Sequence, residues 1–262
     1  MNLAGRSVDC RYHARNRRLI MDSRVKSTRV LGQAIAQCQL PPRVWLNSST
    51  ATIYEHSYET PMDEWKGRVR ATPEAKDEFS LEVAKAWENA FAECHAPDTR
   101  KVAMRTAMVL GTEDGGVYRV LRRLTRLGLG GAMGDGRQFV SWIHADDFCR
   151  AADWLISEAA TCGVVNVTAP NPLVNHEMMN LLRGKLGVPF GLPAAKWMLE
   201  IGAFLLSTET ELIIKSRRVI PRRLEQDGFR FRYRHFEQAV AALERKLEAG
   251  RLQLPLGSEV TA

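Results

Sequence analysis

The sequence lacks a long apolar run and a regular cysteine pattern. Its longest apolar run covers residues 201–206, far short of the roughly 20 residues that a membrane-spanning helix needs. The five cysteines stand far apart and form no C-x-x-C pair, so we predict neither a metal site nor a disulfide framework. Residues 1–18 are rich in arginine and contain no apolar signal segment. We therefore expect a cytoplasmic protein with reduced thiols and no bound metal.

The composition lacks both the low hydrophobicity of a disordered chain and the clustered charge of a nucleic-acid-binding protein. Hydrophobic residues make up 45% of the 262 residues and charged residues 26%, which is ordinary for one or two globular domains. The net charge is +7, but the basic residues are spread over several segments and alternate with acidic ones such as Glu82 and Glu88. Since nucleic-acid-binding surfaces concentrate charge, we expect no nucleic-acid partner. We expect a small-molecule substrate and, because no apolar run is long enough to span a bilayer, no membrane partner.

Helical and extended patterns alternate over the first two thirds of the chain. Apolar residues recur at helical spacing over residues 22–38, 79–91, 118–127 and 145–155. Runs of β-forming residues stand between these segments, over residues 43–47, 102–110, 139–143 and 164–167. This alternation predicts an α/β fold with a doubly wound, Rossmann-type parallel sheet over residues 1–170.

The pattern changes after Pro172. Helical spacing predominates over residues 175–186, 194–205 and 236–247, whereas residues 229–233 alternate like a half-buried strand. We predict a small, mostly helical C-terminal domain over residues 171–262.

Hydroxyl-bearing residues follow the first predicted strand. Ser48, Ser49 and Thr50 come directly after residues 43–47. In open α/β sheets, ligands bind outside the carboxyl ends of the strands. These residues are therefore candidates for a binding or catalytic site.

The glycine-rich run of residues 128–134 is not a dinucleotide fingerprint. In the G-x-G-x-x-G spacing its sixth position is Met133, and the run follows a predicted helix instead of a strand. We interpret it as a helix end that leads into a loop.

The next stretch, residues 134–147, predicts a loop, a strand and a helix start in succession. Arg137 stands between turn residues, where its planar guanidinium suits a phosphate or a carboxylate; an exposed loop arginine equally needs no ligand. His144, Asp146 and Asp147 stand at the helix start, where we expect capping or packing roles in preference to catalysis.

Several of these segments together resemble one enzyme family. In order, they are residues 2–5 (Asn-Leu-Ala-Gly), 48–54 (Ser-Ser-Thr-Ala-Thr-Ile-Tyr), 105–106 (Arg-Thr), 134–138 (Gly-Asp-Gly-Arg-Gln) and 142–147 (Trp-Ile-His-Ala-Asp-Asp). The chain resembles an extended short-chain dehydrogenase/reductase, and more narrowly the YfcH-like NAD-dependent epimerase/dehydratase group. Residues 218–224 and 228–231 are similar to the C-terminal domain of unknown function of that group.

The resemblance implies NAD or NADP as the cofactor of a full-length form and a hydroxyl-bearing substrate such as a nucleotide sugar. Because Phe79 and Val83 occupy the positions of the family's catalytic pair, the catalytic candidates are the nearby hydroxyls of Tyr54 and of Ser49 or Thr50. The resemblance implies cofactor contacts for Ala4, Gly5, Ser48, Arg105 and Thr106. It implies substrate contacts for Gly134, Asp135, Gly136, Arg137 and Gln138.

Two departures from the family pattern lower the activity that we expect. The Asn-Leu-Ala-Gly motif ends the fourth strand in the family, whereas here it begins the chain, so we expect the Gly-rich phosphate loop and the elements around it to be missing. The positions of the family's Tyr-x-x-x-Lys pair hold Phe79 and Val83, neither of which can transfer a proton. We expect an incomplete enzyme that is weakly active or inactive, and we expect the chain as given to bind NAD or NADP weakly or not at all.

The alternative is a non-catalytic binding or assembly module. In that case the sheet edge left bare by the missing strands is covered by a partner or by a second copy in a homodimer, because bare edges invite pairing.

Overall fold

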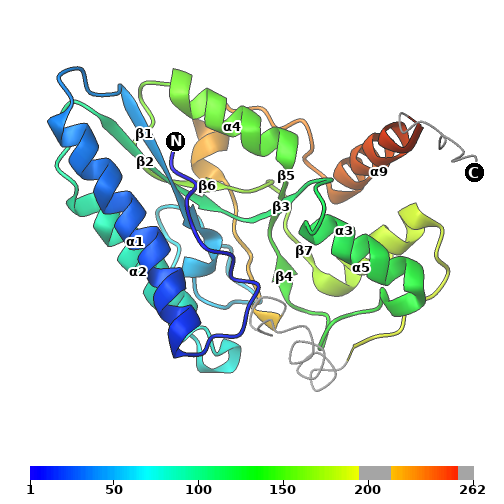
Figure 1. The fold of residues 1–262 in the computed structure, drawn as a ribbon. Coiled ribbons are helices and arrows are strands. Elements are labelled where there is room, and N and C mark those ends of the chain that lie inside the picture. The colour runs from blue at the N-terminus through cyan, green and yellow to red at the C-terminus, as the bar shows by residue number, and fades with distance from the viewer. Residues whose placement is uncertain (195–213, 253–262) are drawn as a thin grey trace, which may run out of the picture.

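The computed structural model describes residues 1–194 and 214–252 (Figure 1). The principal elements, in chain order, are α1 (Ala14–Gln37), β1 (Val44–Thr50), α2 (Glu78–Glu93), β2 (Arg100–Thr106), β3 (Met108–Leu110), α3 (Val117–Leu124), β4 (Phe139–Val140), β5 (Trp142–His144), α4 (Ala145–Ser157), β6 (Gly163–Val167), β7 (Leu173–Val174), α5 (Asn175–Leu186), α8 (Arg222–Gln226) and α9 (Phe236–Leu252). Short helical turns cover Ala51–Ile53 (η1), Pro73–Ala75 (η2) and Thr125–Leu129 (η3). None of the described helices is long and apolar enough to span a bilayer.

The central sheet is parallel, with the strand order β1-β2-β6. The register pairs Thr50 with Thr106 and Thr106 with Val167, so the three strands end together at one edge. Asn2 extends the sheet beyond β1 through a parallel bridge to Asn47. Its amide donates to the Leu46 carbonyl at 2.7 Å, and its carbonyl accepts from the Ser48 amide at 2.9 Å.

Helices cover both faces of this sheet, as the alternation of helices and strands predicts (Figure 1). Successive side chains of a strand point to opposite faces, and β1 shows this directly. Trp45 packs with Phe91 and Ile35 of α2 and α1, whereas Leu46 packs with Leu155 of α4 and Leu224 of α8. The expectation of a doubly wound α/β sheet is thereby confirmed.

Two predicted strands are each divided in the structure. The strand expected over residues 102–110 is β2 in the central sheet followed by β3, which pairs with β5 in a separate small sheet. The strand expected over residues 139–143 is β4 and β5 with Ser141 between them. The hydroxyl of Ser141 donates to the Arg217 carbonyl at 2.7 Å and accepts from the Val219 amide at 2.8 Å. A segment distant in sequence thus interrupts the ladder, which local pattern does not reveal.

Helix boundaries and one predicted strand also differ. Helix α1 begins at Ala14, eight residues before the predicted start at residue 22, because His13 caps its first turn by accepting from the Asn16 amide. Residues 229–233 do not form a strand. Phe229 and Phe231 are buried as the alternation predicts, but the amides that follow are held by a side chain of α4 instead of by a neighbouring strand. The helix expected over residues 194–205 falls almost wholly outside the described residues.

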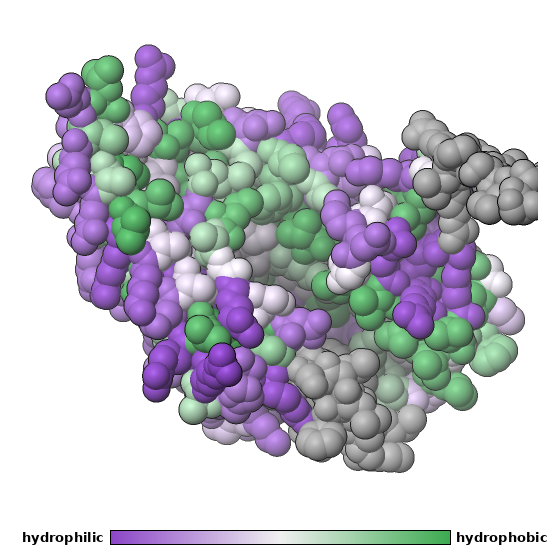
Figure 2. Space-filling model, viewed as in Figure 1, coloured by the Kyte–Doolittle hydropathy of each residue, from purple (hydrophilic) through white to green (hydrophobic). Residues whose placement is uncertain are grey.

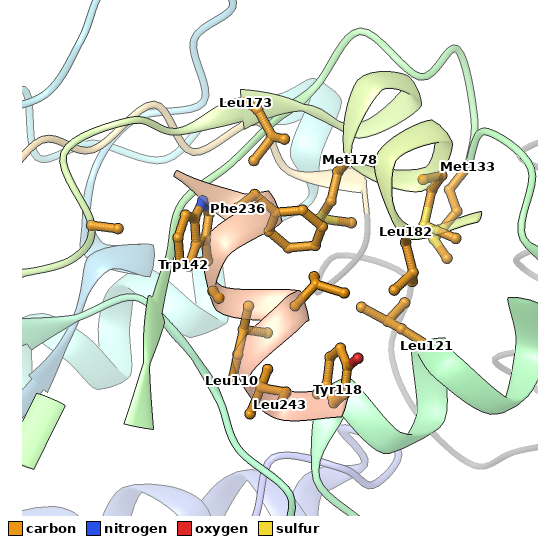
Figure 3. Close-up of a cluster of buried hydrophobic side chains, with 14 residues drawn as sticks. Leu110, Tyr118, Leu121, Met133, Trp142, Leu173, Met178, Leu182, Phe236 and Leu243 are labelled. Carbon is orange, nitrogen blue, oxygen red and sulfur yellow. The ribbon is translucent and has the colours of Figure 1, made fainter. Parts of the chain in front are cut away.

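A second core joins α3, α5 and α9 (Figure 3). The ring of Trp142 meets Phe236 of α9 edge-on, with centroids 5.5 Å apart. Beside it, Tyr118 donates to Glu244 of α9 at 2.6 Å, and Arg122 binds both oxygens of the same carboxylate. The cluster draws residues from both sides of residue 170, so the C-terminal helices are packed directly onto the elements that follow β2.

Candidate active site

The carboxyl ends of β1 and β2 bring several predicted site residues together. Thr50 and Thr106 are register partners at this edge, and Ser48 is hydrogen-bonded to the Asn2 carbonyl. Ala4 and Gly5 follow this bridge directly, the Ala4 amide donating to the Asn2 side chain at 3.0 Å. The predicted cofactor residues thus gather at the edge where ligands bind in α/β sheets.

Below this edge lies a buried polar network centred on Glu88 of α2. Ser49 donates to its carboxylate at 2.5 Å, and Arg105 binds both carboxylate oxygens at 2.8 and 2.7 Å. Burial alone would lower the pKa of Arg105, but the hydrogen bonds and the charge of Glu88 raise it above its ordinary value. Ser49 and Arg105 therefore have a fixed structural partner as well as the predicted site role.

Tyr54 belongs to the same buried layer. Its side chain is 1% exposed, and its hydroxyl donates to Asn166 at 2.9 Å. The guanidinium of Arg105 lies 4.9 Å from the ring centroid, yet burial dominates and raises the pKa of the Tyr54 phenol. Thr50 differs, because it is half-buried and its hydroxyl accepts from the Thr52 amide, capping η1. Of the three predicted catalytic residues, Thr50 is the most exposed to solvent.

The first turns of α2 present an apolar surface. Phe79 and Val83 are buried with Ile20 of α1, and the Phe79 ring meets Tyr12 edge-on at 5.0 Å. These two positions pack the helix against the segment that precedes α1, and neither side chain carries a group that can transfer a proton.

The predicted substrate loop has an outer and an inner part. Gly134 and Gly136 have positive φ angles of 65° and 70°, which only glycine adopts readily. Asp135 and Arg137 are exposed beyond this turn. Gln138 instead points inward, is 1% exposed and donates to the Met133 carbonyl at 2.8 Å.

The outer part faces a second loop, the one that follows η1. The Tyr58 hydroxyl donates to the Asp135 carboxylate at 3.4 Å, and the Arg137 guanidinium lies 5.7 Å from the Tyr58 ring centroid. His56 meets the Tyr58 ring edge-on at 4.9 Å, and burial lowers the pKa of His56. The two loops thus place an arginine and an aromatic ring side by side at the protein surface.

A segment that the sequence did not single out holds both loops. Lys215 and Asp77 form an ion pair at 2.5 Å with both side chains fully buried, and Lys215 also donates to the Thr52 carbonyl at 2.6 Å. The Ser216 amide donates to His56 at 2.9 Å, and the Ser216 hydroxyl accepts from the Phe139 amide at the same distance. Residues 215–216 therefore tie the N-terminus of α2, the turn after β1 and the substrate loop to one another.

Sequence reasoning missed Glu88 and Lys215 for different reasons. Glu88 stands at helical spacing from Ala84 and Phe91, which are both buried. The sequence therefore indicated a carboxylate on the apolar face of α2. Lys215 has no such signal, because its partner Asp77 lies more than a hundred residues earlier in the chain.

His144 caps α4, as expected. Its Nδ1 accepts from the Asp146 amide at 3.0 Å, and its ring lies 4.0 Å from that of Tyr233. Burial lowers the pKa of His144 despite the nearby acidic residues. Asp147 is fully buried and, instead of capping the helix, accepts from the amides of Arg232 and Tyr233 at 3.0 and 2.8 Å.

The chain does not supply the usual cradle for a dinucleotide pyrophosphate. No G-x-G-x-x-G spacing occurs in the sequence, and the glycine-rich run after α3 is filled by the protein itself. A Cβ on Gly131 would lie 2.4 Å from the backbone of Leu192, and one on Gly130 would lie 2.8 Å from the Thr125 hydroxyl. These glycines allow close packing of the chain.

A parallel sheet with helices on both faces and polar residues at the carboxyl ends of its strands defines an α/β protein with a Rossmann-type fold. Comparison with known families narrows this class. The chain belongs to the NAD dependent epimerase/dehydratase family, whose pattern matches residues 1–168. The pattern of a Domain of unknown function (DUF1731) matches residues 194–243.

Individual relatives agree with this assignment. The chain is 29% identical over 243 residues to the epimerase family protein YfhF of Bacillus subtilis, covering 93% of this chain and 77% of the relative. It is 29% identical over 245 residues to the chloroplastic SDR39U1 homolog of Arabidopsis thaliana, covering 93% and 67%. The crystal structure of human epimerase family protein SDR39U1 (isoform2) with NADPH superimposes with a TM-score of 0.82 at 25% identity, covering 93% and 80%.

Removal of the Glu88 carboxylate tests the buried network. In Glu88→Ala the Arg105 side chain, which is only 10% exposed, loses its counter-charge, and we expect the free energy of unfolding to fall by about 3 kcal/mol in urea denaturation. The control is Asp22→Ala, which breaks an exposed ion pair with Lys26 and should cost less than about 1 kcal/mol. Equal losses in both variants would contradict the assigned role of Glu88.

The lowered pKa of His144 predicts a pH-dependent stability. The unfolded chain binds a proton at the ordinary value of 6.5, whereas the folded protein binds it only at lower pH. Acidification from neutral pH through 6.5 should therefore favour unfolding, as measured by urea denaturation across a pH series. His144→Asn keeps a capping acceptor without the titration, so its stability should fall less steeply over the same range. A slope identical to that of the wild type would show that other groups cause the effect.

Proposed function

We propose that this chain carries the substrate side of an NAD(P)-dependent epimerase/dehydratase site and belongs to the YfcH-like group within its family. The proposal rests on one observation. β1 and β2 end together at the carboxyl edge of the sheet, and residues 215–216 connect the turn after β1 to the strand that follows the substrate loop. In this arrangement, Thr50 lies at the sheet edge together with the predicted cofactor residues. The loop that carries Tyr58 and the substrate loop are connected to this edge through residues 215–216.

The proposed substrate is a hydroxyl-bearing compound with a phosphate, such as a nucleotide sugar. Arg137 supports this choice, because a guanidinium on an exposed loop binds phosphate through paired N–H donors. Tyr58 lies beside it and offers a flat apolar surface to a base or a sugar ring. We propose that Asp135 and the glycines on either side of it shape this loop, whereas buried Gln138 supports it from within.

The predicted catalytic hydroxyls are proposed to act in different ways. Thr50 is placed to contact the substrate, because it is half-buried at the sheet edge. Ser49 and Tyr54 are buried below it with protein partners, and we assign them positioning roles through Glu88, Arg105 and Asn166. Their removal should disturb the edge of β1 without removing a group that touches the substrate.

The cofactor assignment is limited to one end of the dinucleotide. Ala4, Gly5, Ser48 and Thr106 are proposed to face its nicotinamide half, with Arg105 beneath. Bound NAD(P) would exchange hydride with the substrate carbon. Since the chain contains no G-x-G-x-x-G loop, we propose that these residues alone bind NAD or NADP weakly and that the activity of this chain is low or nil.

A non-catalytic binding or assembly module is the second candidate function. One observation favours it: Phe79 and Val83 occupy the first turns of α2 with apolar side chains, so these two positions supply no group that can transfer a proton. In this case the edge at Asn2 is proposed to pair with a partner or with a second copy of the chain. A stable monomer without cofactor, found by sedimentation in solution, would count against it.

Calorimetric titration with NADPH and with NAD tests the cofactor proposal. We expect binding weaker than micromolar, because most dinucleotide sites hold the pyrophosphate at a glycine-rich helix start that this sequence does not contain. Submicromolar affinity for either cofactor would contradict the proposal.

Substitution of Arg137 tests the proposed substrate class. Arg137→Ala should weaken the binding of UDP at least about tenfold, since a charge-assisted contact is lost, and should leave the weaker binding of uridine unchanged. Ligand-observed NMR titration measures both. Arg18→Ala, on the exposed side of α1, is the matched control. Equal UDP affinity in the Arg137 and Arg18 variants would exclude Arg137 as the phosphate contact.

A further inference from the structure

The outer side of α3 combines apolar and basic residues. Val117 and Val120 are 44% and 47% exposed, and Arg119 and Arg123 are exposed with them. The inner side of the same helix is buried in the second core through Tyr118 and Leu121. Because core packing accounts only for the inner residues, the exposed valines have no role in the described fold.

This surface continues past the end of α3 into a cluster that we name the apolar tip. Its members are large hydrophobic residues that are 46–64% exposed, namely Leu127, Leu129, Phe190 and Leu192. Two separate segments supply them and are joined by backbone hydrogen bonds, from the Leu192 amide to the Gly128 carbonyl at 2.7 Å and from the Gly131 amide to the Leu192 carbonyl at 3.2 Å.

Glycines make this junction possible. Gly128 has a φ of +78°, and its absent Cβ would lie 3.3 Å from the Phe190 ring. A Cβ on Gly191 would lie 2.6 Å from the backbone of Gly130. The two turns are therefore packed against each other while their large side chains project outward. Figure 2 shows hydrophobic surface at the lower right, next to strongly hydrophilic surface, in the region of α3 and α5.

Basic side chains border the apolar tip. Arg126 is 44% exposed and Arg123 is exposed on the same helical segment, and Arg183 donates to the Gly130 carbonyl at 2.7 Å. Two nearby acidic groups are paired: Asp114 with Arg119 at 2.8 Å, and Glu244 with both Arg122 at 2.6 Å and Arg126 at 3.7 Å. Two arginines thus share the single charge of Glu244, and Arg123 forms no ion pair among the described residues. The border thus keeps an excess of positive charge, in a chain whose net charge is +7.

We propose that the apolar tip enters the headgroup region of an anionic lipid bilayer while the bordering arginines contact lipid phosphates. Basic residues beside leucine and phenylalanine are typical of segments that lie on membranes. Three of the four residues of the apolar tip are leucines, which are under-represented at the energetic centres of protein interfaces, and the tip contains no tryptophan or tyrosine, so an acidic protein partner fits less well. The expectation of no membrane partner rested on the lack of a spanning segment, which surface binding does not need.

Co-sedimentation with vesicles tests this proposal on the full chain. We expect binding to vesicles of phosphatidylcholine mixed with phosphatidylglycerol, little binding to phosphatidylcholine alone, and release by salt. The double variant Leu127→Ser and Phe190→Ser should bind at least about tenfold more weakly, and Arg123→Glu about tenfold more weakly. Binding that is equal for both vesicle types would overturn the proposal.

Matched controls separate insertion from general adhesion. Leu40→Ser changes a residue that is 92% exposed near the far end of α1, and Arg18→Glu reverses a charge on α1; both should bind vesicles as the wild type does. A loss in these controls equal to that in the tip variants would overturn the proposal, because it would show that no particular surface is used.

A second measurement follows the tip directly. In Phe190→Trp, the added tryptophan fluorescence should be quenched by brominated lipid in anionic vesicles, whereas that in Leu40→Trp should not. Unquenched fluorescence in both variants would overturn the proposal. Self-association of the wild type that Phe190→Ser abolishes, without vesicle binding, would instead assign the tip to a contact between copies and would also overturn it.

Discussion

The buried ion pair between Lys215 and Asp77 constrains the candidate site more than any other contact. Two buried charged side chains are stable in a protein only when they are paired and hydrogen-bonded. Lys215 also donates a hydrogen bond to the Thr52 carbonyl. The pair therefore fixes the C-terminal segment against the start of α2 and the turn after β1. Ser216, the next residue, then positions His56 and the first residue of β4. Residues far apart in the chain consequently share one rigid surface beside the sheet edge.

The Glu88 network gives two of the predicted site residues a partner within the protein. Ser49 and Arg105 look like site residues by their place in the sequence, yet in the fold both bind one buried carboxylate. Tyr54 is likewise engaged with Asn166. Together they stiffen the ends of β1 and β2 and leave Thr50 as the predicted catalytic residue most exposed to solvent.

Helix α3 illustrates how one short element can serve two surfaces. Its inner residues join the core with α5 and α9, and Arg122 is held there by Glu244. Its outer residues, one or two positions away, carry the exposed valines and arginines. The 3.6-residue period places these two sets of side chains on opposite sides of the helix.

The local sequence pattern was sufficient to predict the α/β class and the elements α2, α4, α5 and β6, because these depend on the periodicity of apolar residues. It was also sufficient to predict the capping role of His144, which depends on the chemistry of helix starts. The sequence also contained the readable but overlooked position of Glu88 on the apolar face of α2. Tertiary structure alone decided the division of the strands at Ala107 and Ser141, the lack of a strand at residues 229–233, and the pairing of Lys215 with Asp77. In each case the deciding partner is distant in the chain, as Arg217 is for Ser141 and Asp147 is for Tyr233. Burial and pairing between remote segments are properties of the packed chain, and no local spacing encodes them.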